Sequence, residues 1–202
     1  MKVYITRHGE TLWNQEGKMQ GWKNSNLSLK GIENAKKLGQ HLEDIRFDAV
    51  YCSSLGRAQE TAAHIIGDKP LVITYCDDLK EMNFGKWEGM RHTDIDLLYA
   101  EQRNNFWNNP LYYKSIEGEN FSDLLARAEI FIEKLKQLKD VENVLIVSHA
   151  IYIKALYSVI KGYTVNEFWN PPFIKDTSLT ILNIQDSKIE IELEADTSHL
   201  FL

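Results

Sequence analysis

The sequence predicts an α/β fold, in which a three-layer, open and mostly parallel sheet carries helices on both faces. Short apolar runs typical of buried strands recur along the chain, and most are separated by segments whose apolar residues repeat at helical spacing. The last two runs are joined by a short polar segment, and the final run alternates apolar with polar residues, as an antiparallel edge hairpin does. The expected strands span residues 3–6, 47–52, 71–75, 144–148, 179–184 and 189–193.

Four helices are expected around these strands. Ser28 is a plausible N-cap for the first, whose apolar residues recur at steps of three and four. Gly67 ends the second, because a residue without a side chain permits a left-handed C-terminal conformation. The third carries a broad apolar stripe. The expected helices run from Ser28 to Ile45, from near Ser54 to Gly67, over residues 122–139, and from after His149 to Gly162.

Residues 84–121 interrupt this alternation. Eight aromatic residues crowd a segment with poor strand signals and with Asn and Pro breaks. We expect a lid-like helical insertion over the functional site, with its rings packed mainly against the core; a stacking site for a planar ligand is the alternative. Because no linker, repeat or low-complexity tract marks a boundary, we expect residues 1–202 to form a single domain.

Composition excludes several classes of protein. Apolar residues make up 44% and charged residues 26% of the chain, which is normal for a globular protein and unlike a disordered one. A net charge of -6 with scattered basic residues argues against a nucleic-acid or membrane surface. With neither a signal peptide nor a membrane span in the sequence, we expect a cytoplasmic protein. Cys52 and Cys76 are expected to be buried thiols without a chemical role.

Candidate functional side chains follow four of the expected strands. Arg7 and His8 come after the first strand and Arg57 after the second. Glu81 comes after the third and His149 after the fourth. Ligands of open α/β sheets bind outside the carboxyl ends of the strands, so we expect these five side chains to meet in one pocket. Any one of them alone is more often a structural residue, and the prediction depends on their convergence.

These residue types suit a phosphomonoester. Arginine offers a planar fork of donors that stays protonated, so two arginines can balance the phosphate dianion. A neutral imidazole held through one ring nitrogen can attack phosphorus with the other, which is the role we expect of His8. His149 is expected to donate to the phosphoryl oxygens. A carboxyl kept protonated can protonate the leaving alkoxide and then activate water, and Glu81 is the candidate.

The motifs around these residues resemble the histidine phosphatase superfamily, also called the phosphoglycerate mutase-like family, nearly end to end. The mark of that family is an Arg-His-Gly opening with a later Ser-His, found here at residues 7–9 and 148–149. The resemblance implies that His8 is the phosphorylated nucleophile, that Arg7, Arg57 and His149 form the phosphate pocket, and that Glu81 is the proton donor. It extends to Asn14 near the phosphate, the Gln20-Gly21-Trp22 loop, Arg57-Ala58-x-x-Thr61, the segment from Glu81 to Gly89, and Glu117-Gly118-Glu119 with Arg127.

Three positions depart from the family pattern. A polar loop, residues 24–28, replaces Asp-x-Pro-Leu-Thr, which puts substrate contacts there in question. Ala150 replaces the usual glycine after the second histidine, and its small size should preserve the pocket. Asp176 replaces a common asparagine, and an acid so close to a phosphate site argues against contact with the ligand.

The resemblance favours a metal-independent phosphatase without a cofactor, acting on a small phosphorylated metabolite. The wording of residues 81–89 is most similar to the α-ribazole phosphatase branch and its broad-specificity relatives. One alternative is a cofactor-dependent phosphoglycerate mutase, although Met82-Asn83-Phe84-Gly85 stands where those mutases have Arg-His-Tyr-Gly. A second alternative is a phospho-ligand sensor. The remaining histidines lack metal-ligand spacing, and the sequence makes no prediction of oligomeric state.

Overall fold

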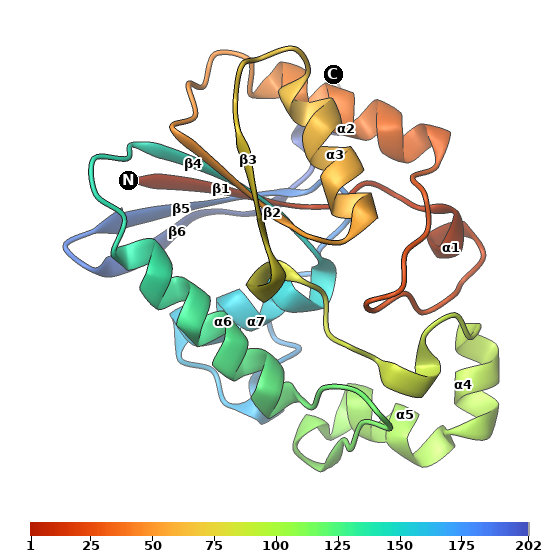
Figure 1. Cartoon of the computed structure of the whole chain (residues 1–202). Helices are drawn as coiled ribbons and strands as arrows, with labels where there is room; N and C mark the ends of the chain where they lie inside the picture. Colours follow the sequence, from red (N-terminus) through yellow and green to blue (C-terminus); the bar gives the residue numbers. More distant parts are fainter. Residues whose placement is uncertain (202) are drawn as a thin grey trace.

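The computed structural model describes residues 1–201, whose strands form one mixed sheet (Figure 1). The strand order is β3-β2-β4-β1-β5-β6. Strands β3, β2, β4 and β1 run parallel, whereas β5 and β6 are antiparallel to their neighbours. The predicted fold class is therefore confirmed. The strands are β1 (Lys2–Arg7), β2 (Ala49–Ser53), β3 (Ile73–Cys76), β4 (Asn143–Ser148), β5 (Leu179–Gln185) and β6 (Lys188–Asp196).

Helices cover both faces of the sheet (Figure 1). Successive side chains of a strand point to opposite faces, so β1 serves both layers. Tyr4 packs in the core beneath one pair of helices, and Val3 and Ile5 pack in the core beneath the other pair. Each such fully buried side chain contributes about 1.5–3 kcal/mol. The pairs are α2 (Leu29–His41) with α3 (Gly56–Ile66), and α6 (Phe121–Lys136) with α7 (Ala150–Lys161).

Several element ends differ from the sequence-based prediction. The first long helix, α2, ends at His41 instead of reaching Ile45. Beyond it the backbone closes tighter turns, in which Glu43 N donates to Gln40 O and Ile45 N to Leu42 O. Other shifts are smaller: α3 begins at Gly56 and not near Ser54, β3 spans Ile73–Cys76 and not 71–75, and α6 spans Phe121–Lys136 and not 122–139.

The segment 84–121 is helical and aromatic, as predicted. Its central rings are buried: Trp87 is 2% exposed and Phe106 1%. Their centroids lie 5.8 Å apart in an edge-on arrangement. Trp107 and Tyr112, in contrast, are 45% and 67% exposed. Its elements are η2 (Gly85–Trp87), α4 (His92–Leu98), α5 (Ala100–Asn108) and η3 (Pro110–Tyr112), and the remaining short helices of the chain are α1 (Leu12–Gln15), η1 (Asp77–Leu79), η4 (Val165–Glu167) and η5 (Ser198–Phe201).

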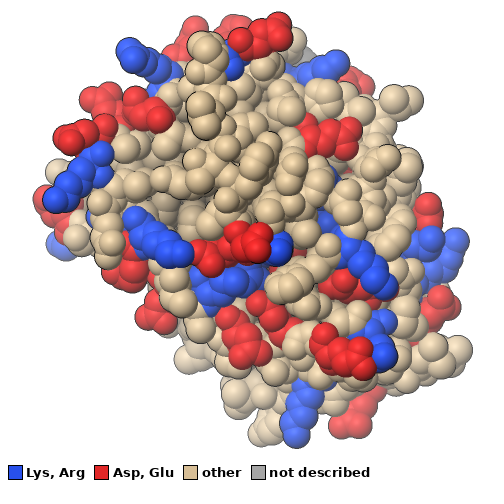
Figure 2. Space-filling model, viewed as in Figure 1, with Lys and Arg blue, Asp and Glu red and all other residues tan. Residues whose placement is uncertain are grey.

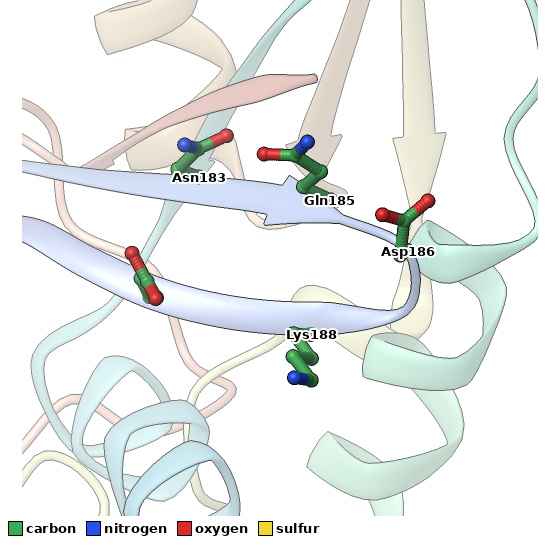
Figure 3. Close-up of a pocket in the computed structure, with 5 residues that line it drawn as sticks. Asn183, Gln185, Asp186 and Lys188 are labelled. Carbon is green, nitrogen blue, oxygen red and sulfur yellow. The ribbon is translucent and has the colours of Figure 1, made fainter.

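Pockets also occur away from the carboxyl ends of the strands, including one of about 550 Å³ lined by residues 43–48 and 69–71. Basic and acidic side chains are interspersed on the face shown in Figure 2. A pocket of about 250 Å³ on the edge hairpin is lined by polar side chains such as Asn183 and Lys188 (Figure 3). Asn183 pairs with Lys2, so this pocket lies at the amino end of β1. No helix within residues 1–201 is long and apolar enough to cross a membrane.

Candidate active site

A pocket of about 270 Å³ opens at the carboxyl ends of the parallel strands. Arg7 ends β1, Arg57 lies in the first turn of α3, Glu81 follows β3 through η1, and His149 is the N-cap residue of α7. The first three of these residues line the pocket together with His8. His149 is fully buried beside it, with its ring centroid 5.1 Å from that of His8. The structure therefore brings the five predicted residues together.

His8 presents one free ring nitrogen. Its Nδ1 lies 2.7 Å from the carbonyl oxygen of Gly9. A carbonyl can only accept, so Nδ1 donates its proton and Nε2 keeps its lone pair. Burial, with smaller contributions from Arg57 and Arg7, holds the pKa of His8 well below its usual value. The ring is therefore neutral near pH 7 and nucleophilic at Nε2.

Gly9 fixes the backbone beneath this ring. Its amide donates to Thr61 Oγ1 at 2.9 Å, which ties the turn after β1 to α3. A Cβ at Gly9 would lie 2.6 Å from the carbonyl oxygen of Gly31 in α2. Such a contact cannot be accommodated between two backbones, so the Arg-His-Gly opening requires glycine for close packing.

His149 is held by a hydrogen bond to the end of a neighbouring strand. Its Nε2 lies 2.7 Å from Ser53 Oγ, at the end of β2. Its Nδ1 is buried and has no hydrogen-bond partner among the described residues. Burial, together with the charge of Arg57, keeps the pKa of His149 well below its usual value. When the Ser53 hydroxyl donates to Nε2, the proton resides on Nδ1, which has no partner within residues 1–201.

Arg57 is buried and Arg7 is partly buried, and neither forms an ion pair with a described carboxylate. Arg57 is 1% exposed, and its terminal nitrogens donate to the carbonyls of Gly21 and Lys23, both at 2.7 Å. Arg7 donates to the carbonyl of Ile174 at 2.9 Å. Burial lowers the pKa of Arg57 to about 10 and also lowers the pKa of Arg7, yet both remain cationic near pH 7. Neutral carbonyls thus bind both guanidiniums directly, and nearby carboxylates such as Glu81 offset part of their charge without forming an ion pair. A bound dianion would balance the remaining charge.

The Glu81 carboxylate accepts hydrogen bonds from three backbone amides. Met82 N and Tyr152 N donate to Oε1 at 2.9 and 3.0 Å, and Ile151 N donates to Oε2 at 3.2 Å. Two of these donors are unpaired amides in the first turn of α7, whose dipole also favours negative charge. Burial nevertheless dominates and raises the pKa of Glu81 above its usual value. A raised pKa favours the protonated carboxyl that a proton donor needs.

A second set of contacts fixes the backbone of Glu81. Its carbonyl oxygen accepts from Trp22 Nε1 at 2.8 Å and from Arg127 Nη2 at 3.1 Å. Arg127 also donates to the carbonyls of Asp78 and Lys80 and pairs with Glu119 at 2.9 Å. The sequence matched Arg127 and Glu119 to a family pattern without giving them a role. The structure shows that they anchor the segment that carries Glu81.

Glu88 performs a similar task for Arg57. Its carboxylate accepts from the amides of Trp22 and Lys23, at 2.7 and 3.0 Å. This loop supplies the carbonyls that hold the Arg57 guanidinium. Gly21 has φ +56°, and a Cβ there would lie 2.1 Å from the Glu88 carboxylate. The sequence matched Glu88 to the family pattern, within the segment from Glu81 to Gly89, without giving it a role.

The other predicted positions fall into two groups. Asn14, Gly21 and Ala150 line the pocket. The loop 24–28 does not line it, and it serves the framework instead: Asn24 accepts from Arg57 N at 2.8 Å, and Ser28 caps α2. Asp176 accepts from Asn34 at 3.3 Å and also lies outside the lining. Within residues 1–201, no group of three or more His, Cys, Asp or Glu side chains could hold a metal ion.

Comparison with known proteins identifies the superfamily to which this fold and site belong. The profile of the histidine phosphatase superfamily (branch 1) matches residues 3–197. The chain belongs to that superfamily, as its motifs predicted. Among solved structures, Bacillus stearothermophilus YhfR superposes with a TM-score of 0.95 and 36% identity, over 98% of each chain.

Curated relatives include both phosphatase and mutase names. An Escherichia coli K12 protein named adenosylcobalamin/alpha-ribazole phosphatase is 34% identical over 170 residues, 84% of each chain. The name "Probable phosphoglycerate mutase GpmB" belongs to another Escherichia coli relative, 30% identical over 217 residues, which cover 99% of this chain and 95% of that one. The phosphatase name supports the predicted enzyme class, and the mutase name keeps the predicted alternative in view.

Proposed function

We propose that this protein is a metal-independent phosphomonoesterase that works through a phosphohistidine on His8. The observation that carries the proposal is a pair of arginines, buried Arg57 and partly buried Arg7, which line one pocket with a neutral imidazole and form no ion pair with a described carboxylate. A phosphate dianion balances both charges, and its phosphorus can then meet the His8 lone pair.

The first step transfers the phosphoryl group to the enzyme. His8 Nε2 attacks phosphorus, and the bond to the ester oxygen breaks. The leaving alkoxide takes the proton from Glu81, which becomes a carboxylate. Arg7, Arg57 and the N–H of His149 stabilise the charge that spreads over the equatorial oxygens. The products of this step are the free alcohol and phosphohistidine.

The second step regenerates the enzyme. The Glu81 carboxylate removes a proton from water, and the resulting oxygen nucleophile attacks phosphorus as the bond to His8 Nε2 breaks. Inorganic phosphate leaves, and Glu81 is again protonated. In this scheme the three amides that bind the Glu81 carboxylate stabilise it between the two steps.

The proposed substrate is a small phosphorylated metabolite. The first candidate is α-ribazole phosphate, and the alternative is broad specificity for metabolite phosphates. The likeness of residues 81–89 to the α-ribazole phosphatases supports the first, and so do the aromatic rings of Phe84, Phe106 and Trp107 in the lining. Comparable turnover of α-ribazole phosphate and simple sugar phosphates would support broad specificity instead. The cytoplasmic location stays a prediction.

Turnover of p-nitrophenyl phosphate in the presence of EDTA tests the proposed function. The wild-type chain is expected to release p-nitrophenol and phosphate, and His8→Ala to lose this activity by at least about 10⁴-fold. Full activity in His8→Ala would remove the phosphohistidine from the mechanism. Tight phosphate binding without turnover by the wild type would favour a sensor.

The mutase alternative needs a separate measurement. Phe84 lines the pocket where the mutase motif would supply tyrosine and cationic groups for a phosphoglycerate carboxylate. We therefore expect 3-phosphoglycerate to be hydrolysed faster than it is isomerised. Isomerisation well above hydrolysis would replace the phosphatase with a mutase.

A further inference from the structure

A second pocket, of about 410 Å³, adjoins the candidate active site. The two pockets share a wall made by Trp107, Ala150, Ile151 and Phe173. Phe173 is 73% exposed and Trp107 is 45% exposed, so large apolar surfaces face the space between the two pockets and the solvent. A substrate whose phosphate lies beside His8 can therefore extend its alcohol part into the second pocket.

Lys154 gives this second pocket a charge. It lies one helical turn beyond Ala150 on α7, about 5–6 Å further along the axis, and lines the second pocket but not the first. The residue is 6% exposed. Its Nζ donates to the carbonyl of Pro171 at 2.6 Å and lies 5.7 Å from the Trp169 ring centroid. No carboxylate among the described residues forms an ion pair with it.

A buried ammonium has three N–H donors, and here only one has a protein acceptor. Leaving a charge buried and unpaired is costly, and burial lowers the pKa of Lys154 to about 8. The amine is still mostly protonated at pH 7. Its surroundings are apolar apart from the Asn108 side chain and backbone groups. An anionic group entering this pocket would find a single cation and apolar walls.

We propose that the second pocket is a leaving-group subsite in which Lys154 binds an acidic group on the alcohol part of the substrate. The inference rests on the proposed phosphatase function in its broad-specificity form, because the alcohol of α-ribazole phosphate carries no acidic group. Within that form it names the preferred substrate class: phosphomonoesters whose alcohol carries a second anionic group, separated from the phosphate by an apolar spacer. The spacer packs along Trp107 and Phe173, and the anion pairs with the Lys154 ammonium.

The test uses ω-carboxyalkyl phosphates of increasing chain length, each paired with its neutral primary amide. The acid and the amide have nearly the same shape, so the ratio of their kcat/KM values isolates the charge. In the wild-type chain we expect this ratio to peak at about tenfold in favour of the acid at one chain length, because a charge-assisted hydrogen bond contributes about that factor. In Lys154→Met the ratio should fall to that of the shortest pair.

Lys161→Met is the matched control. Lys161 lies at the last turn of the same helix, pairs with Glu194 and lines neither pocket. Its substitution should leave the peak in place, and Lys154→Arg should retain a preference for the acid. Thermal unfolding checks that each variant folds. If Lys154→Met does not fold, the wild-type series decides, because a ratio that does not change with chain length overturns the inference.

Two kinds of failure are distinguishable. Turnover of p-nitrophenyl phosphate with no acid preference at any length, or with a preference that survives in Lys154→Met, overturns the subsite while the phosphatase stands. Absence of turnover with every phosphomonoester overturns the phosphatase and the subsite together. A preference of Lys154→Met for the amide at the peak length would support the subsite, since the charge then has no partner.

Discussion

The two ends of the active-site pocket are built differently. At the inner end, His8, Arg57 and Glu81 are nearly fully buried, and each forms hydrogen bonds with backbone groups. At the outer end, Trp107 and Phe173 come from α5 and the loop after η4, and both keep large exposed surfaces. The inner end has the rigidity that phosphoryl transfer requires, whereas the outer end can vary without disturbing it. We therefore expect the inner end to carry the chemistry and the residues of the outer end to influence the choice of substrate.

The largest effect is expected when the proposed proton donor, Glu81, is removed from the inner end. Glu81→Gln should lower kcat/KM for alkyl phosphates by about 10²–10⁴-fold, because the alkoxide then leaves without a proton. For p-nitrophenyl phosphate, whose leaving group barely needs protonation, the loss should stay below about tenfold. Because kcat/KM reports steps only up to release of the alcohol, it excludes the hydrolytic step. Equal losses for both substrates would mean that Glu81 is structural.

A weaker effect is expected from the residues that anchor Glu81. Arg127→Leu removes the bonds to three backbone carbonyls and should lower kcat for alkyl phosphates by about tenfold with little change in KM. p-Nitrophenyl phosphate should suffer less, which a general loss of stability would not produce. Arg91→Leu, at an exposed arginine bonded to Glu16 O, is the control. An equal drop for both substrates would contradict a positioning role.

At the outer end, single substitutions should change affinity and leave the chemical step intact. Trp107→Ala should raise KM for aromatic phosphate esters by about 3–10-fold, the value of a lost aromatic contact, and hardly alter kinetics for small alkyl phosphates. Tyr112→Ala removes another exposed ring of the insertion that does not line the pocket. If Tyr112→Ala has the same effect as Trp107→Ala, the outer wall does not contact the substrate.

The buried histidines of the inner end should also make the free energy of unfolding depend on pH. The pKa values of His8 and His149 are lowered in the folded protein, chiefly by burial, so both rings take up protons on unfolding at acidic pH. Stability is then full above the unfolded pKa of about 6.5 and is lost as the pH falls below it, by about 1.4 kcal/mol per pH unit for each such histidine. Urea unfolding in phosphate-free buffer measures this slope. His8→Asn should reduce it by one histidine, and an unchanged slope would contradict the burial argument.

The sequence predicted the residues of the inner end of the pocket better than those of the outer end. The strand-end rule placed His8, Arg57 and Glu81 together, because parallel strands bring their carboxyl ends to one edge whatever lies between them. The rule did not predict the hydrogen bonds by which other residues hold these three side chains in place. Asn24 caps α3 from a distant loop, and the Glu88 carboxylate holds the loop that binds Arg57. Such contacts depend on how loops fold back, which no local periodicity encodes.

The outer end was predicted only in outline. The aromatic content of residues 84–121 indicated a helical insertion, and the structure shows that most of its rings pack inward. Trp169, which is distant in the sequence, donates to the Phe106 carbonyl and packs against the Trp107 ring, a contact that the periodicity of the insertion does not encode. Lys154 looked like an ordinary helix residue, and its burial appears only once α7 packs against the loop that contains Pro171. The second pocket is therefore a property of the assembled fold.

Trapping the covalent intermediate tests the central claim most directly. The full chain is mixed with p-nitrophenyl phosphate, quenched in base within a turnover and analysed by mass spectrometry of its peptides. The account predicts one added phosphoryl group on His8, labile to acid because it is bound through nitrogen, and none in His8→Ala. Phosphorylation of another residue, or turnover with burst-free kinetics and no phosphorylated peptide, would contradict it.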